Sequence, residues 1–160
     1  MISYSLSNPE YISQDSTSYG LQNDMRFIGP SYINFGNNFN PKGDFSLEFW
    51  IYINYHNNSI FYWDKIIQKY NMLSGIGFIT SLGDDLSIIF CVSGNRLVSE
   101  TRLSLFRWYH IFITYSRLSM KIYINGLIDS QIVLSGDKLD IIDNSTNKMS
   151  IPNCIKIKKK

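Results

Sequence analysis

The stretch SMKIYINGLIDSQIV (residues 119–133) decides the fold class of this chain. Two apolar runs meet in it at Asn125-Gly126, a pair that tolerates positive φ and gives the strongest short-range signal of a β-hairpin. The rest of the chain has the same character, because short runs rich in Ile, Phe and Tyr alternate with turn residues. The sequence therefore predicts an all-β protein.

The hairpin itself has two candidate registers. A two-residue turn would place Ile122 opposite Asp129, which sets a carboxylate against a core position. A three-residue loop with Gly126 as a left-handed bulge would pair Ile122 with Ile128 and Lys121 with Asp129. The second register matches apolar faces and opposite charges, so we expect the bulged hairpin.

Two longer runs indicate how the strands assemble. FSLEFWIYI (45–53) alternates, and one face would carry Phe45, Leu47, Phe49, Ile51 and Ile53. RWYHIFITY (107–115) is apolar at both sets of positions, as is typical of a central strand. KMSI (148–151) is the last clear strand pattern, and no helical periodicity of useful length occurs. Many short strands at roughly even spacing predict a two-sheet antiparallel jelly-roll sandwich.

We expect three segments along the chain. Residues 1–24 are polar and Ser/Tyr-rich and should form an irregular N-terminal lead-in, followed by the sandwich domain over 25–151. Residues 152–160 are expected to be a basic tail or a short edge strand, because Ile155 and Ile157 alternate with lysines.

Composition excludes several classes of protein. The chain has 160 residues, of which 44% are hydrophobic and 15% aromatic, so it is globular and not disordered. Its net charge of +2 gives no reason to expect a nucleic-acid partner. We expect no membrane span, because no apolar run is long enough to cross a bilayer.

An ordered series of segments resembles the laminin-G-like, concanavalin A-like jelly-roll superfamily: FSLEFWIYI, KIIQKY, GIGFITSLGDDLSIIFCVSG, RWYHIFITY and MKIYINGLIDSQI. Members carry an early F-T-hydrophobic-E-x-W strand, a later W-x-H-hydrophobic strand and a hydrophobic-Y-hydrophobic-N-G hairpin. The matching residues here are Phe45, Leu47, Glu48 and Trp50; Trp108 and His110; and Tyr123, Asn125 and Gly126. The segment 107–131 is also similar to the jelly-roll half of the clostridial neurotoxin receptor-binding region, which implies a shared fold and not shared toxicity.

The resemblance includes glycoside hydrolases, which need two carboxylates flanking the scissile bond. Strand carboxylates share a face only when they alternate. The Glu residues of the chain are Glu10, Glu48 and Glu100. Glu48 and Glu100 have no acidic neighbour two residues away, and Asp84-Asp85 would point to opposite sides of a turn. We therefore expect no enzyme, and we expect His110 to be a packed, hydrogen-bonded core residue.

Binding is the better interpretation, because aromatic faces and amide or carboxylate groups are the side chains that hold sugars. The candidate ligand-binding residues are Trp50, Tyr52, Tyr55, Asn57, Tyr62, Trp63 and Asp64. The alternative for Trp50 and Trp63 is a purely structural role, in which they fill the core or cover a sheet face. We expect a non-catalytic module for carbohydrate or glycoconjugate recognition or adhesion, with a glycan or glycoprotein partner. The alternative is a structural or protein–protein interaction module of a surface or particle assembly.

Calcium is the cofactor that the resemblance implies, although the residues themselves require none. Asp15, in DSTSYG (15–20), is the one metal-ligand position that carries over, and the acidic loop DKLDIID (137–143) could supply oxygens or simply be a solvated loop. The resemblance suggests an extracellular, surface or virion location, while the N-terminus shows no signal-peptide pattern.

Overall fold

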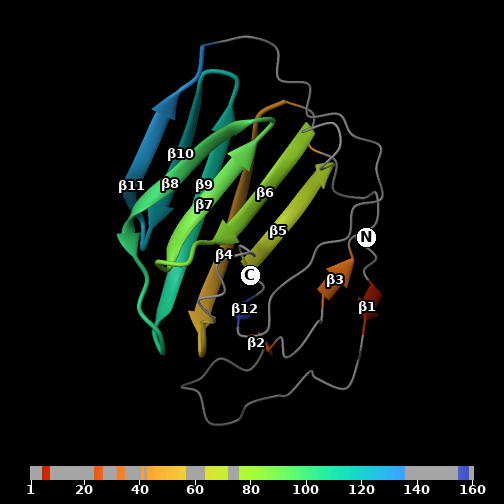
Figure 1. The fold of residues 1–160 in the computed structure, drawn as a ribbon, viewed down its shortest axis with the longest axis vertical. Helices are drawn as coiled ribbons and strands as arrows, with labels where there is room; N and C mark the ends of the chain where they lie inside the picture. Colours follow the sequence, from red (N-terminus) through yellow and green to blue (C-terminus); the bar gives the residue numbers. More distant parts are fainter. Residues whose placement is uncertain are drawn as a thin grey trace.

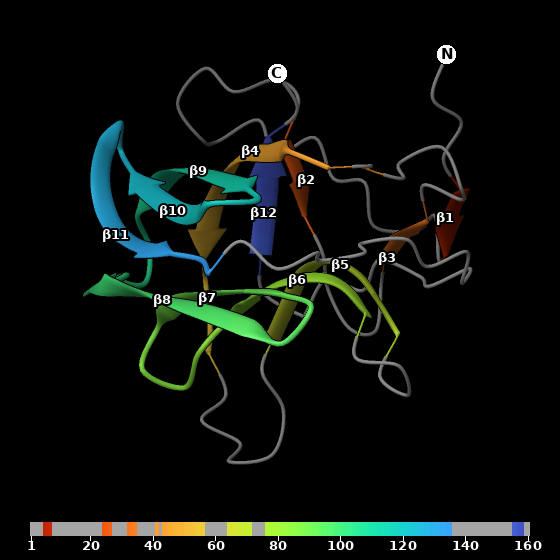
Figure 2. The ribbon, with the colours of Figure 1, turned by 90° about the horizontal axis from the view of Figure 1, so that it is seen from above.

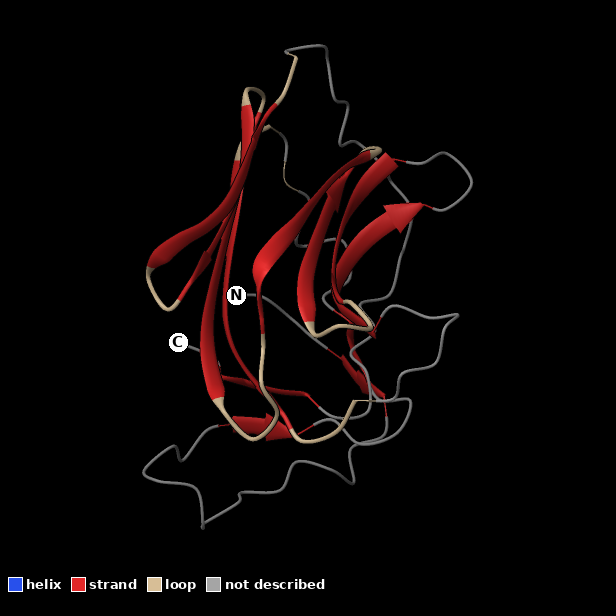
Figure 3. Ribbon diagram, turned by 60° about the vertical axis from the view of Figure 1, so that its left-hand side comes forward, coloured by secondary structure: helices blue, strands red, loops and turns tan. Residues whose placement is uncertain are grey.

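The computed structural model describes residues 5–7, 24–26, 32–34, 41, 43–56, 64–71, 76–135 and 155–158. These residues form twelve strands: β1 (Ser5–Ser7), β2 (Asp24–Arg26), β3 (Tyr32–Asn34), β4 (Phe45–Ile53), β5 (Asp64–Asn71), β6 (Ile76–Leu82), β7 (Ser87–Val92), β8 (Asn95–Arg102), β9 (Trp108–Ser116), β10 (Ser119–Ile124), β11 (Leu127–Val133) and β12 (Ile155–Lys158). The described residues contain strands, turns and loops but no helix (Figure 3).

Two antiparallel sheets lie face to face, which confirms the predicted sandwich. The larger has six strands in the order β11-β10-β9-β4-β12-β2, and the smaller has four in the order β5-β6-β7-β8. Figure 2 shows them as two layers, with β5–β8 on one side and β4, β9, β10 and β12 on the other. A separate two-stranded sheet, β1-β3, lies to the side of the sandwich (Figure 1).

The path of the chain explains the strand order. It runs from β4 into the four-stranded meander β5–β8, returns for the meander β9–β11, and ends with β12 between β4 and β2. β9 pairs with β4 on one side and β10 on the other, so its prediction as a central strand is confirmed.

Four parts of the predicted segmentation need correction or stay untested. The lead-in was expected to be irregular, but it contains β1 and the first residue of β2. The strand at 155–158 exists, yet it is not an edge strand, because β2 pairs along its outer side. KMSI (148–151) lies outside the described residues, and the domain limits at 24/25 and 151/152 remain predictions.

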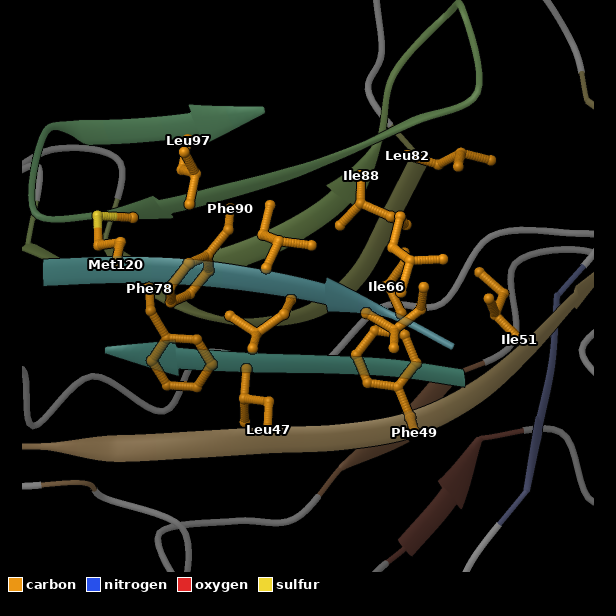
Figure 4. Close-up of a cluster of buried hydrophobic side chains, with 14 of the residues drawn as sticks. Leu47, Phe49, Ile51, Ile66, Phe78, Leu82, Ile88, Phe90, Leu97 and Met120 are labelled. Atoms are coloured by element: carbon orange, nitrogen blue, oxygen red, sulfur yellow. The ribbon is translucent and has the colours of Figure 1, made fainter. Parts of the chain in front are cut away.

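The core forms where the alternating faces of the two sheets meet. On β4, Leu47, Phe49, Ile51 and Ile53 are buried as expected, and Phe45 packs against the core from its rim. Figure 4 shows Leu47 and Phe49 facing Phe78 and Phe90 across the space between the sheets. Burying such side chains is the main stabilising contribution to a sandwich of this kind, about 1.5–3 kcal/mol for each large apolar residue.

The turn at Asn125-Gly126 differs from the expected bulged hairpin. Ile124 pairs with Leu127, so only two residues form the turn, and both have positive φ, 52° and 83°. This is the pattern of a type I′ turn, whose twist matches that of the flanking strands. The expected pairing of Ile122 with Ile128 is wrong, since Ile128 lies opposite Tyr123.

The bulge does exist, but it lies further along β11. Ile122 pairs with Ser130, so the register shift leaves Asp129 as the extra residue. Its carboxylate accepts backbone N–H groups of Glu100 (2.8 Å) and Thr101 (3.1 Å) on β8, in the opposite sheet. The bulge thereby points the Asp129 carboxylate away from the core. Its hydrogen bonds to β8 link the two sheets at this edge, where β11 curves toward β8 (Figure 2).

We expect the substitution Gly126→Ala to lower the free energy of unfolding by about 1–2 kcal/mol, because an L side chain is strained in the left-handed region. A Cβ at this position would meet no atom within 4 Å, so the cost comes from the backbone angle and not from a clash. Urea denaturation measures the change. Leu127→Ala, at the adjacent and 76% exposed position, is the control and should be nearly neutral. Equal stability of Gly126→Ala and wild type would contradict the type I′ turn.

Candidate functional site

The outer surface of the six-stranded sheet carries an array of aromatic side chains on three neighbouring strands. It arises because the same alternation that buries every second residue of β4, β9 and β10 sends the others outward. We call this array the aromatic face and define it by these residues: Glu48, Trp50 and Tyr52 of β4, Trp108, His110 and Phe112 of β9, and Tyr123 of β10.

The rings of the aromatic face meet in pairs across the strands. Tyr52 and Trp108 have centroids 5.4 Å apart and planes inclined at 49°. Trp50 and His110 are 5.1 Å apart at 45°.

The third pair is Phe112 and Tyr123, which are 5.5 Å apart at 48°. Outward positions along a strand are about 6.8 Å apart and strands about 4.8 Å apart, so the face spans roughly 14 Å by roughly 10 Å. It is a platform longer than one sugar ring.

Hydrogen bonds fix the middle of this platform. His110 Nε2 lies 3.0 Å from Glu48 Oε1, which holds the imidazole beside the indole of Trp50. His110 is hydrogen-bonded, as expected, but it is half-buried on the outer face and not in the core.

The β10–β11 hairpin turn is hydrogen-bonded to the backbone of β9 at His110. The backbone N–H of Asn125 donates to the carbonyl of His110 (2.8 Å), and the His110 N–H donates to Asn125 Oδ1 (3.0 Å). The Asn-Gly pair therefore does more than reverse the chain, because Asn125 also anchors the strand segment that presents His110.

Only part of the predicted binding set is brought together. Trp50, 37% exposed, and Tyr52, half-buried, lie on adjacent outward positions of the aromatic face. Tyr55 is 59% exposed in the segment after β4, beyond the last ring pair. Asp64 is the first residue of β5, in the other sheet, and its side chain is not described. Asn57, Tyr62 and Trp63 lie outside the described residues.

Sequence reasoning missed the contribution of β9 and β10 to the aromatic face. Trp108, Phe112 and Tyr123 all occupy outward positions opposite the predicted candidates or their neighbours. The signal was present, because the alternation in RWYHIFITY assigns Trp108, His110 and Phe112 to one face. What the sequence did not reveal was that this strand lies beside β4.

Two of the described carboxylates outside the aromatic face have structural partners. Asp129 accepts two backbone N–H groups, and Asp85 accepts the Ser87 hydroxyl at 2.6 Å and pairs with the Arg102 guanidinium. The Ser87 hydroxyl is the main favourable contact that lowers the pKa of Asp85, with Arg102 adding to it, while burial acts against them. Glu48, at an outward position of β4, is the described carboxylate of the aromatic face.

No metal site is evident in the part of the chain that the structure describes, where no three His, Cys, Asp or Glu side chains are grouped to hold an ion. Asp15 and the loop 137–143 lie outside the described residues, so calcium remains untested. The described residues also contain no helix long and apolar enough to cross a membrane.

The sequence profile of the concanavalin A-like lectin/glucanases superfamily, in its Laminin_G_3 form, matches residues 29–153. The chain belongs to this superfamily. Its name covers both lectins and glucanases, so membership states the fold and leaves binding or catalysis to be decided by the site. No curated protein sequence matches the chain.

Solved structures of binding proteins share this superfamily fold with the chain. The receptor-binding domain of botulinum neurotoxin type G gives a TM-score of 0.60 at 20% identity, over 98% of this chain and 42% of the other. A presumed carbohydrate-binding protein from Bacteroides ovatus gives 0.56 at 20% identity, over 72% and 35%. The carbohydrate-binding module CBM66 from Bacillus subtilis gives 0.51 at 12% identity, over 96% and 90%. The chain thus spans less than half the length of the first two, and these likenesses establish the fold alone.

Proposed function

We propose that this chain is a non-catalytic module that binds carbohydrate on the aromatic face. The observation that carries the proposal is the alignment of three ring pairs on one outward surface, where His110 of the middle pair is hydrogen-bonded to Glu48. Flat aromatic surfaces pack against the C–H faces of sugar rings, while polar groups at their margin bond to hydroxyls. Two of the solved structures that share this fold are described as carbohydrate-binding proteins, which supports a carbohydrate as the ligand of this chain.

The absence of a carboxylate pair on the described aromatic face supports the non-catalytic part of the proposal. A glycosidase needs a second carboxylate roughly 5–10 Å from the first. The described face offers Glu48, and its Oε1 lies against His110. A single, already bonded carboxylate is suited to binding a hydroxyl group.

A glycan array tests the proposal, read once with calcium and once with a chelator. We expect the wild-type chain to bind a defined glycan and Trp50→Ala to weaken that binding about tenfold or more, since a truncated Trp anchor is a typical hot-spot loss. The control is Val133→Ala, which removes an apolar side chain that is 83% exposed on β11 and is not on the aromatic face.

The array also distinguishes the carbohydrate-binding function from the second candidate function, that of a protein-interaction module. That candidate is favoured by three exposed apolar side chains on the edge strand β11: Leu127 (76%), Ile128 (51%) and Val133 (83%). A folded chain that binds no glycan, or whose binding is lost in Val133→Ala and kept in Trp50→Ala, would overturn the carbohydrate site on the aromatic face.

A further inference from the structure

The turn between β8 and β9 holds an aromatic residue in a backbone conformation that bulky residues disfavour. Phe106 has a φ of 60°, in the left-handed region, where Gly and Asn are the usual residues. Its side chain is 68% exposed, so burial of the ring offsets little of the backbone strain. The neighbouring Leu105 is also exposed, at 37%. A strained residue with an exposed ring points to a contact made by that ring outside the fold.

Two hydrogen bonds and a cation–π contact fix this turn. The Phe106 N–H donates to the carbonyl of Ile53 on β4 (2.8 Å), and the Ser104 N–H donates to the Tyr109 hydroxyl (3.0 Å). The guanidinium of Arg107 lies over the Tyr109 ring, 5.5 Å from its centroid. These contacts hold Phe106 in its strained conformation. A ligand that meets the ring therefore does not have to order the turn first.

The turn lies at one end of the aromatic face. Tyr52 pairs with Trp108 where β4 ends and β9 begins (Figure 1). Phe106 precedes Trp108 by two residues, about 6.6 Å of extended chain, and its hydrogen bond to Ile53 places its backbone directly beyond this pair. Tyr55, 59% exposed, follows Tyr52 by three residues at the same end. Two exposed rings thus flank the last ring pair of the aromatic face.

The exposed rings at this end fit a sugar chain better than a protein surface. With Phe106, the row of outward rings lengthens from roughly 14 Å to roughly 20 Å. A specific protein interface buries about 800 Å² on each partner, which is more than the exposed parts of Tyr55, Leu105 and Phe106 can supply. A sugar ring needs only one aromatic surface for its C–H face, and successive rings of a chain can use successive surfaces.

We infer that Tyr55 and Phe106 form an end subsite of the aromatic face, and that the module recognises an oligosaccharide chain in preference to a single sugar. The inference rests on the proposed carbohydrate-binding function and adds the class of carbohydrate to it. A sugar on the aromatic face contacts Trp50 and the pair Tyr52–Trp108. The next sugar of the same chain contacts Phe106 and Tyr55, so a longer chain binds more tightly.

The test is isothermal titration calorimetry of the whole chain with β-1,4-linked glucose, β-1,4-linked mannose and α-1,4-linked glucose oligosaccharides, from the monosaccharide to the hexasaccharide. We expect the affinity for at least one series to rise with length. Phe106→Asn should weaken hexasaccharide binding about tenfold and leave disaccharide binding unchanged, whereas Trp50→Ala should weaken both. Leu118→Ala is the matched control, because Leu118 is 67% exposed on the β9–β10 turn at the opposite end, and it should bind every length as the wild type does.

The outcomes separate the end subsite from the function on which it rests. A wild-type chain that binds no member of the three series would contradict both. Binding that does not rise with length, or hexasaccharide binding that is unchanged in Phe106→Asn, would overturn the end subsite alone. Binding to phosphatidylcholine vesicles that is lost in Phe106→Asn, with hexasaccharide binding unchanged, would assign the Phe106 ring to a lipid surface instead.

Thermal unfolding gives an independent check on the role of the ring. Phe106→Asn should have a Tm equal to or higher than that of the wild type, because Asn tolerates the left-handed region and the lost ring is exposed. Leu103→Ala is the control within the same turn, since Leu103 is 2% exposed, and it should lower the Tm by at least about 4 °C. A Phe106→Asn variant with an equally lowered Tm would show that the fold itself needs the ring, and would overturn its assignment to a ligand.

Discussion

Phe90→Ala is expected to lower the free energy of unfolding by about 3–5 kcal/mol, because it removes a ring from a site that cannot collapse around the void. Phe90 is fully buried, and the ring of Phe45 meets it edge-on at 6.2 Å. It lies on β7 in the four-stranded sheet and faces the six-stranded one (Figure 4). A loss of this size is a large part of the 5–15 kcal/mol by which a domain is typically stable.

Denaturant unfolding followed by tryptophan fluorescence measures this change. Phe112→Ala is the matched control, because it makes the same truncation on the half-buried aromatic face. It should destabilise clearly less than Phe90→Ala. If the two variants lost the same stability, Phe90 would not lie in the core between the sheets.

Asp129→Ala is expected to lower the free energy of unfolding by about 1.5–3 kcal/mol, the range for hydrogen bonds to a charged group. The Asp129 carboxylate receives the backbone N–H groups of Glu100 and Thr101 from the other sheet. Without it, these two groups must turn to water and the edge between β11 and β8 loses its polar link. Amide hydrogen exchange at Glu100 and Thr101 should accelerate more than at the paired Leu97.

Two variants sharpen the Asp129 prediction. Asp129→Asn keeps one acceptor oxygen and should lie between Asp129→Ala and wild type. Gln131→Ala, at an exposed position two residues along the same strand, should have little effect. Unchanged exchange at Glu100 and Thr101 in Asp129→Ala would refute the link between the sheets.

The fold could be predicted because its signals are local. The alternation in FSLEFWIYI indicates which residues of β4 enter the core, and Asn125-Gly126 indicates a hairpin. Both depend on short stretches of backbone and on period-two patterning, which the sequence displays directly.

The register of the hairpin could not be derived in the same way. Pairing energies within the hairpin favoured Lys121 opposite Asp129, and each such pair contributes only about 0.2–1 kcal/mol. Two long-range contacts accompany the observed register: Asn125 bonds to His110, and Asp129 bonds to β8. Neither contact is visible from residues 119–133 alone.

The site was predicted in part for a related reason. Trp50 and Tyr52 could be assigned to the outer surface from the pattern of their own strand. Trp108 and Phe112 belong to the same surface only because β9 pairs with β4, about sixty residues earlier in the chain.

The strict alternation of β9 also bears on how such a protein can change. Tyr109, Ile111 and Ile113 are buried, while Trp108, His110 and Phe112 face outward. Substitutions at the outward positions remove little packing, so many of them should leave the sandwich folded. β9 thus carries two sets of positions under different constraints. Packing restricts substitutions at the buried set, whereas the outward set can change and give a new binding specificity. Randomising only the outward residues should therefore yield folded variants that differ in what they recognise.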